Sequence, residues 1–404
     1  MLSVLVRGGY SGEKAVSSLR AANWAWLTIG AALALSVLGV YAIDVARASE
    51  PHAEFDLAAT AWKQVVFLII GMLAAVVVSL PHIRLVGPLS YLGMALSVGL
   101  LVFLLLPGVP TWLVTPRNGA RGWINLGVVD LQPAELAKIA SVLSAAWYMR
   151  FRDSHRELKG LIVPALFAGA PMALIILQPD LGSAMLFAPA ILAMLVAAGA
   201  RLRHIALVLG VGAVLVPASY PLMKEHQRAR IVALIEQVRG DRSRADTINF
   251  QSFTAQTIAG AGEWGGVSDA KSRALVRYNG LPERHNDMVF SVIVNRFGFA
   301  GGVVTLGLYL VWTAGALLTA ATCRDPFGRL VCVGLTAFIL AQVFVNVGMN
   351  IGILPIIGIT LPYVSYGGSS MLATWLMAGL VMNVALHKPV RHRRRSFEYD
   401  GDDA

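Results

Sequence analysis

The chain has 404 residues, of which 56% are hydrophobic and 14% charged, against about 25% charged residues in an average soluble domain. Its formal net charge is +10. This composition excludes an ordinary soluble globular domain and indicates an integral membrane protein. The two cysteines, Cys323 and Cys332, support neither a disulfide framework nor a thiolate metal site.

Apolar stretches recur along the whole chain. A helix that crosses a membrane needs about 20 apolar residues, and about ten stretches meet or nearly meet this length. They are 23–44, 63–80, 88–107, 133–149, 160–178, 180–200, 204–223, 287–320, 328–352 and 366–387. The first stretch is long enough to span and follows basic residues, so we expect a retained helix rather than a cleaved signal peptide.

The basic residues of the short loops fall after the even-numbered stretches, and basic residues favour the cytoplasmic side. We therefore expect an all-α integral membrane protein with about ten transmembrane helices and both termini in the cytoplasm. The expected organisation is a cytoplasmic N-terminal segment 1–22, a polytopic membrane domain 23–387 and a cytoplasmic tail 388–404. A large extracytoplasmic loop, 224–286, would connect helices 7 and 8.

The stretch GARGWINLGVVDLQPAELAKIA, 119–140, contains the first candidate site residues. Pro133 suits the first turn of a helix, and Glu135 would follow where the helix dipole favours an anion. Lys138 lies three residues later on the same face, so the two side chains can pair. Two interpretations stay open: a capped helix start with a local ion pair, or ionisable groups that face a cavity inside the bundle.

The stretch LQPDLGSAMLF, 177–187, repeats this pattern with Asp180 after a glutamine and a proline. Two acidic helix starts on the outer side suggest a polar cleft between helices. Helix capping alone would explain each of them separately.

The long outer segment contains HQRARIVALIEQV, whose apolar residues have helical spacing beside arginines such as Arg228 and Arg230. Such a helix could lie in the membrane interface and hold an anionic lipid head group. A solvated amphipathic connector fits the same spacing. The following GAGEWGG turn has no strand before it, so we do not interpret it as a nucleotide-binding loop.

The stretch LPERHNDMVF, 281–290, places four charged or titratable residues at the mouth of an apolar segment. If the helix starts near the proline, Glu283 and Asp287 fall at i and i+4 on one face, and repulsion raises the pKa of at least one carboxyl. Such a group is suited to take a proton from a sugar hydroxyl. Arg284 and His285 would hold a phosphate leaving group or neutralise the pair. The alternative is an ordinary capped helix start.

The stretch 346–370, NVGMNIGILPIIGITLPYVSYGGSS, is interrupted by two prolines and a serine- and glycine-rich run. Its backbone groups must be satisfied by protein or water, which favours a re-entrant or broken segment that lines a cavity. A plain extracellular hairpin is the alternative. Ser365 and Ser369 are candidate substrate-binding residues in this run.

Five stretches together resemble the SEDS family (shape, elongation, division and sporulation), the bacterial multi-pass polymerases of lipid-linked peptidoglycan precursor. They are NGARGWINLG, LQPAELAK, LQPDLGSA, LPERHNDMVF and GILPIIGITLPYVSYGGSS, in family order over nearly the whole chain. The sequence LPERH, 281–285, is more similar to the elongation, or rod-shape, branch than to the division branch, where alanine is usual in place of Arg284.

The resemblance implies a peptidoglycan glycosyltransferase that polymerises lipid II, releases undecaprenyl pyrophosphate and works with inversion in the bacterial inner (cytoplasmic) membrane. It assigns the essential aspartate to Asp287, the expected general base. The other family positions fall on Trp123, Glu135, Lys138 and Asp180. Arginines such as Arg228, Arg230 or Arg284 would stabilise the leaving pyrophosphate. A divalent cation, magnesium or manganese, is left open as a cofactor.

The resemblance also implies a class B penicillin-binding transpeptidase as a partner, because a polymerase alone yields uncrosslinked glycan. Other membrane proteins of the elongation complex are further expected partners, and no nucleic acid is expected. A lipid II flippase or another multi-pass transporter is the rival function. Against it, the acids gather on the outer side rather than at the midplane, and no internal inverted repeat is evident.

The sequence departs from the family pattern at several positions. Gly122 precedes the tryptophan where arginine is usual, and Met288 replaces a common aromatic residue. Asn295 and Arg296 stand where many members have paired glutamates. A charge about two and a half turns into a membrane helix costs several kcal/mol unless it is paired. Either a partner acid lies elsewhere in the bundle, or the polar network of the family is altered.

Overall fold

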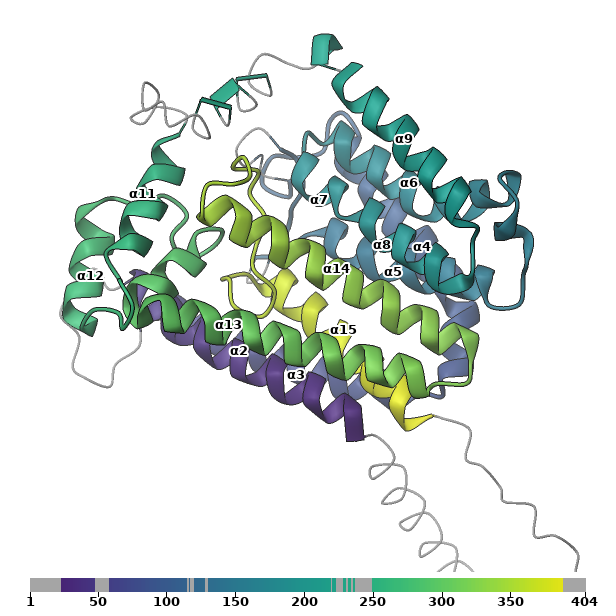
Figure 1. The fold of residues 1–404 in the computed structure, drawn as a ribbon, viewed down its shortest axis with the longest axis horizontal. Coiled ribbons are helices and arrows are strands. Elements are labelled where there is room, and N and C mark those ends of the chain that lie inside the picture. Colours follow the sequence, from purple (N-terminus) through teal and green to yellow (C-terminus); the bar gives the residue numbers. More distant parts are fainter. Residues whose placement is uncertain are drawn as a thin grey trace, which may run out of the picture.

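Long apolar helices make up most of the computed structural model (Figure 1). The structure describes residues 23–47, 58–114, 116, 120–127, 130–218, 220–222, 228–229, 232–233, 235–236 and 249–387. The terminal segments 1–22 and 388–404 and much of the outer loop therefore lie outside the described residues.

The helices of the bundle follow the predicted spans one by one. They are α2 (Asn23–Arg47), α3 (Ala59–Ser79), α4 (Ile83–Leu105), α5 (Pro133–Met149), α6 (Ile162–Leu177), α7 (Leu181–Met185), α8 (Phe187–Ala198), α9 (Leu202–Ala218), α13 (Val289–Thr322), α14 (Pro326–Asn350) and α15 (Gly368–Leu386). Within the described residues, 8 segments are long and apolar enough to cross a membrane, with α7 and α8 together forming one of them. The 17 residues of α5 and the shorter apolar part of α9 correspond to the remaining predicted spans.

Smaller elements lie between the long helices. They are β1 (Ile124–Asn125), β2 (Asp130–Leu131), the 3₁₀ turns η1 (Ser154–Arg156), η2 (Lys159–Leu161) and η3 (Tyr220–Leu222), and the outer helices α11 (Phe250–Gly260) and α12 (Asp269–Tyr278). The two strands pair antiparallel, with Ile124 opposite Leu131. The start of α2 and the end of α15 lie at one end of the bundle, and α11 and α12 lie at the other (Figure 1).

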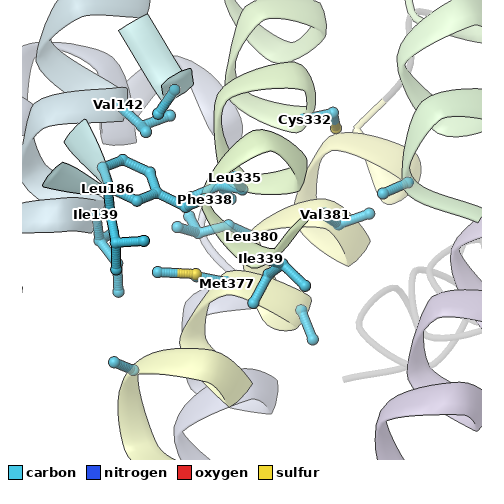
Figure 2. Packing of buried hydrophobic residues seen from close by; sticks show 14 of the residues in the cluster. Ile139, Val142, Leu186, Cys332, Leu335, Phe338, Ile339, Met377, Leu380 and Val381 are labelled. Carbon is cyan, nitrogen blue, oxygen red and sulfur yellow. The ribbon is translucent and has the colours of Figure 1, made fainter. Parts of the chain in front are cut away.

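The core gathers around α14, which packs against α5, α8, α13 and α15. Figure 2 shows apolar side chains of α5, α14 and α15 meeting there, together with Leu186 at the junction of α7 and α8. Phe338 meets Phe187 edge to face at 5.2 Å between ring centroids. Small residues bring neighbouring helices close: a Cβ added at Gly379 of α15 would lie 2.5 Å from the carbonyl oxygen of Ala75 in α3.

A break in α13 lies at Gly298, whose φ is 70°. The glycine-rich turn of the outer loop packs onto this break, where Phe299 N donates to the carbonyl oxygen of Glu263 at 2.7 Å. A Cβ added at Gly298 would lie only 2.3 Å from the carbonyl oxygen of Trp264. The glycines of this turn thus permit backbone to touch backbone, which fixes the outer loop on the membrane bundle.

Candidate active site

The segment 281–288 is a tight turn, and α13 begins only at Val289. The expectation that Glu283 and Asp287 lie one helical turn apart on one face is therefore wrong. Glu283 has a φ of 46°, and its carbonyl oxygen accepts from Asn286 N at 2.9 Å and Met288 N at 3.2 Å. The helix starts late because its first turn is capped from another helix rather than by a side chain at Met288.

Two asparagines of α14 hold the main chain of Asp287. Asn346 Nδ2 and Asn350 Nδ2 donate to the Asp287 carbonyl oxygen at 2.8 and 2.9 Å. Both asparagines are fully buried. Neither asparagine was among the candidate residues predicted from the sequence, although amides repeated every four residues in an apolar helix indicate an inward-facing polar stripe.

The segment 351–367 folds back into the bundle between α14 and α15. Its side chains Leu361, Tyr363 and Val364 are at most 1% exposed, so the re-entrant interpretation is confirmed and the plain hairpin is excluded. Ser365 Oγ donates to the carbonyl oxygen of Asn286 at 2.6 Å, and Tyr366 N donates to that of His285 at 2.9 Å. The buried segment is thereby tied to the turn that contains Asp287.

Asp180 approaches the same buried segment from another side. Its carboxylate accepts from Ser183 N at 3.0 Å and caps α7. A Cβ added at Gly182 would lie 2.6 Å from the carbonyl oxygen of Ile357, and one added at Gly358 would lie 3.5 Å from Asp287 Oδ2. Asp180 therefore caps α7, and its negative charge also acts on Asp287.

The Asp287 carboxyl is poised to exchange a proton near neutral pH. Burial, helped by the negative charges of Glu283 and Asp180, raises its pKa to about 7. Within the described part of the chain, no side chain donates a hydrogen bond to this partly exposed carboxylate. A carboxylate with a raised pKa and free oxygens can act as a general base.

Positively charged side chains contact other parts of the turn that contains Asp287. Arg47, at the end of α2, donates from its guanidinium to His285 Nε2 at 2.8 Å. Burial and the nearby Arg47 lower the pKa of His285 to about 4, so its ring is neutral and accepts this bond. Arg284 donates to the carbonyl oxygen of Val276 at 3.3 Å. Arg47 was not among the predicted site residues, because a basic residue at the end of a membrane helix is typical of an ordinary membrane flank.

Glu135 and Lys138 form the predicted ion pair at 2.7 Å, and both are buried, at 4% and 1% exposed. Lys138 Nζ also donates to Gln342 Oε1 at 3.3 Å, and Gln342 Nε2 donates to the carbonyl oxygen of Thr360 at 2.9 Å. Glu135 Oε2 is buried without a hydrogen-bond partner. The pair is thus a helix-start pair and also faces the bundle interior, where it connects to the buried segment 351–367.

Ser369 joins the start of α15 to the start of α5. Its hydroxyl donates to the carbonyl oxygen of Asp130 and accepts from Gln132 N, the latter at 3.0 Å. Trp123 is half-buried immediately before β1. Ser369 is thereby tied to β2 and to the start of α5, and Trp123 precedes the strand that pairs with β2.

Of the two predicted arginines of the long outer segment, the structure describes Arg228, which contacts η3. The Arg228 guanidinium donates to the main-chain carbonyls of Tyr220 (3.1 Å) and Pro221, in η3. Arg230 and most of the predicted interface helix lie outside the described residues. Among the described arginines expected to hold a pyrophosphate, Arg284 belongs to the turn that contains Asp287, whereas Arg228 contacts η3.

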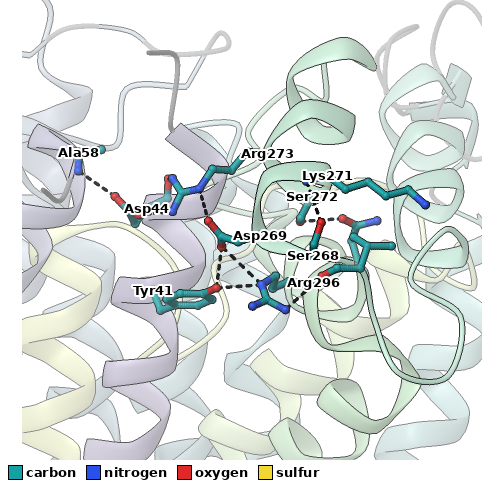
Figure 3. A network of polar contacts seen from close by, with 11 residues as sticks. Tyr41, Asp44, Ala58, Ser268, Asp269, Lys271, Ser272, Arg273 and Arg296 are labelled. Carbon is teal, nitrogen blue, oxygen red and sulfur yellow. Dashed lines mark hydrogen bonds and ion pairs between the residues drawn. The ribbon is translucent and has the colours of Figure 1, made fainter. Parts of the chain in front are cut away.

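Arg296 has a partner acid, as one of the two hypotheses required (Figure 3). Its Nε donates to Tyr41 OH at 2.8 Å and lies 3.4 Å from Asp269 Oδ1. Arg273 continues the network, with Nε 2.6 Å from Asp269 Oδ2 and its NH2 group 2.6 Å from Asp44 Oδ2. The charge lies before the Gly298 break and faces α2 and α12, so it is not alone in the membrane core.

Comparison with known proteins finds a family and relatives that match most of this chain. The model of a family described as "Cell cycle protein" (FtsW, RodA, SpoVE) matches residues 23–389. A probable peptidoglycan glycosyltransferase FtsW of Nitrosococcus halophilus is 31% identical over 366 residues, which cover 89% of this chain and 91% of that protein. The peptidoglycan glycosyltransferase MrdB of Escherichia coli K12 is 33% identical over 324 residues, covering 79% and 85%.

Solved structures share the fold. A chain from work on "structural coordination of polymerization and crosslinking by a peptidoglycan synthase complex" superposes with a TM-score of 0.75 at 30% identity, covering 89% of this chain and 97% of that one. The rod shape determining protein RodA of Thermus thermophilus gives a TM-score of 0.64 at 28% identity, covering 89% and 96%. The family model that matches residues 23–389 and the relatives at 31% and 33% identity show that the chain belongs to the FtsW, RodA and SpoVE family, the SEDS family of multi-pass membrane proteins.

Proposed function

We propose that this protein is a peptidoglycan glycosyltransferase that polymerises lipid II into glycan strands and releases undecaprenyl pyrophosphate. The relatives described above are named as peptidoglycan glycosyltransferases. The observation in this chain that carries the proposal is the Asp287 carboxylate, which has a pKa of about 7 and no protein donor within the described residues.

Asp287 acts as the general base in this proposal. It takes the proton of an acceptor sugar hydroxyl while that oxygen forms a bond to the anomeric carbon of the donor sugar. The bond from this carbon to the pyrophosphate breaks on the opposite face, so the configuration inverts. A base works best when its pKa lies near the working pH, and the burial that raises the pKa of Asp287 meets this requirement.

The leaving pyrophosphate needs positive charge. Arg284 is part of the turn that contains Asp287, and Arg47 contacts this turn at His285. Guanidinium groups match phosphate oxygens with two parallel hydrogen bonds. Within the described residues, no cluster of three or more side chains could hold a metal by protein ligands alone. A magnesium or manganese ion would therefore need further oxygen ligands from the substrate pyrophosphate.

A class B penicillin-binding transpeptidase is the proposed partner. The support is the structural neighbour from a peptidoglycan synthase complex, described as coordinating polymerisation and crosslinking. We propose that the chain belongs to the elongation branch. The LPERH sequence at 281–285 and the similarity to RodA support this proposal. The inner membrane and cytoplasmic termini are part of the same proposal.

Purified protein, alone and with its transpeptidase partner, should be given fluorescent lipid II with and without a divalent cation. The proposal predicts a ladder of glycan strands on a gel. A protein that binds lipid II and moves it across vesicle membranes but never forms glycan would overturn the proposal in favour of the transporter function.

A further inference from the structure

The main chain of Asp287 is held from outside its own segment. The two α14 amides that donate to its carbonyl oxygen come from residues four apart, so they project from the same face of the helix. Both Asn346 and Asn350 are 0% exposed. A buried amide is costly unless it is hydrogen-bonded, and here two of them converge on one carbonyl.

Asn350 also holds the beginning of α13. Its Oδ1 accepts from Ser291 N at 3.1 Å and from Ser291 Oγ at 2.7 Å. The first N–H groups of a helix need acceptors, and Met288 supplies no side-chain cap. One side-chain amide thereby fixes both the last turn before α13 and its first turn.

These contacts leave the Asp287 carboxylate free to face the site. Asn346 Nδ2 also donates to the carbonyl oxygen of Ile359, at 2.6 Å, so the buried segment beside the carboxylate is held by the same side chain. The charged groups that act on Asp287 are Glu283, in its own turn, and Asp180, at the start of α7. From α14 it receives only these neutral amides.

We propose that Asn350, acting with Asn346, is a positioning residue for glycosyl transfer: it holds the Asp287 main chain so that the carboxylate meets the acceptor hydroxyl. This inference rests on the proposed function of Asp287 as the base. Asn350 itself touches no reacting atom, so its effect must be measured through Asp287.

Two substitutions separate this role from a general contribution to folding. Asn350→Asp keeps the shape and the acceptor for Ser291, removes the donor to Asp287 and adds a negative charge nearby. Asn350→Leu removes donor and acceptor at similar volume. The matched controls are Asn383→Asp and Asn383→Leu, because Asn383 is equally buried and donates to the carbonyls of Val78 and Pro81 at the other end of the bundle.

In the full chain with its partner, Asn350→Asp should lower kcat about tenfold or more with little change in KM, because misplacement affects chemistry more than binding. In the pH profile of kcat for Asn350→Asp, the acid-side midpoint should shift to higher pH by about one unit, because a like charge disfavours the ionised form of Asp287. Asn350→Leu should lower kcat without this shift. Per folded molecule, the Asn383 variants should keep the kcat and pH profile of the unchanged protein.

A second readout does not depend on activity. A carbodiimide modifies the protonated carboxyl of Asp287, and the peptide between Arg284 and Arg296 contains no other acidic residue, so mass spectrometry can follow its labelling against pH. The labelling midpoint should rise in Asn350→Asp and stay unchanged in Asn383→Asp.

If Asn350→Asp has the same kcat and the same labelling midpoint as the protein without substitutions, the positioning role is overturned. The proposed function still stands in that case, provided that the protein without substitutions makes glycan. If the unchanged protein makes no glycan, the proposed function fails, and the labelling midpoint alone decides whether Asn350 controls Asp287.

Discussion

Arg296 Nε lies 3.4 Å from Asp269 Oδ1, and this contact joins the break in α13 to the outer helix α12. Asp269 also binds Arg273 and Tyr41. Although burial raises the pKa of Asp269, its hydrogen bonds with Arg273 and Tyr41 hold the pKa below its usual value. The network therefore stabilises the contact between the outer loop and the bundle at pH values at which Asp269 is ionised. This stabilisation is lost as the pH falls and Asp269 becomes protonated.

Asp269→Ala should lower the free energy of unfolding by about 1 kcal/mol, a modest value because the Asp269 side chain is 40% exposed. The measurement is thermal unfolding in detergent at neutral pH. Asp153→Ala is the matched control, because its pair with Arg156 is long, at 3.8 Å, and both side chains are largely exposed. Equal effects of the two substitutions would contradict a structural role for the network.

The buried pair of Glu135 and Lys138 predicts a strongly non-additive result. Lys138→Met should destabilise the protein by about 3 kcal/mol or more, because it leaves Glu135 as an unpaired buried charge. Adding Glu135→Gln should recover most of that loss. A double-mutant cycle by thermal unfolding checks this, and additive effects would mean that the two charges do not depend on each other.

Local patterns predicted the elements whose signals are local. Gln132 and Pro133 marked the start of α5, and the three-residue spacing of Glu135 and Lys138 predicted their ion pair. The two prolines and the uncharged serine–glycine run predicted the buried segment 351–367, because a segment without charge is poorly suited to lie in water.

Contacts between distant parts of the chain could not be predicted in this way. Asn350 lies 63 residues from Asp287, and no local sequence pattern around either residue predicts their hydrogen bond. For the same reason the helix start was placed too early: the sequence around Pro282 resembles a local start, whereas the true cap of α13 comes from α14. The acid that pairs with Arg296 likewise lies on a different helix.

Glu283 should control the pH dependence of polymerisation. The rate should fall on the acid side with a midpoint at about pH 7, which is the pKa of Asp287. Glu283→Gln removes a like charge, so the acid limb should move to lower pH, while glutamine keeps an acceptor for Asn286, whose Nδ2 donates to Glu283 Oε2 at 2.6 Å. Glu157→Gln, an exposed acid distant in sequence, is the control and should leave the midpoint unchanged.

The raised pKa of Asp287 also predicts that this residue costs stability. An acid whose pKa is higher in the folded than in the unfolded state favours folding most at low pH, and this contribution is lost between about pH 4 and about pH 7. Asp287→Asn should therefore increase the melting temperature, and the increase should grow with pH over this range. A pH-independent difference between the two proteins would show that burial does not perturb Asp287.

The most direct test of the central claim is polymerisation of fluorescent lipid II by Asp287→Asn, with substrate binding measured on the same preparation. Asparagine keeps the size of the side chain and cannot accept the proton at neutral pH. We predict that glycan ladders disappear while lipid II binding stays within about twofold of the unchanged protein, since the lost interaction belongs to the transition state. Ladders of normal length and rate in Asp287→Asn would contradict the assignment of Asp287 as the base.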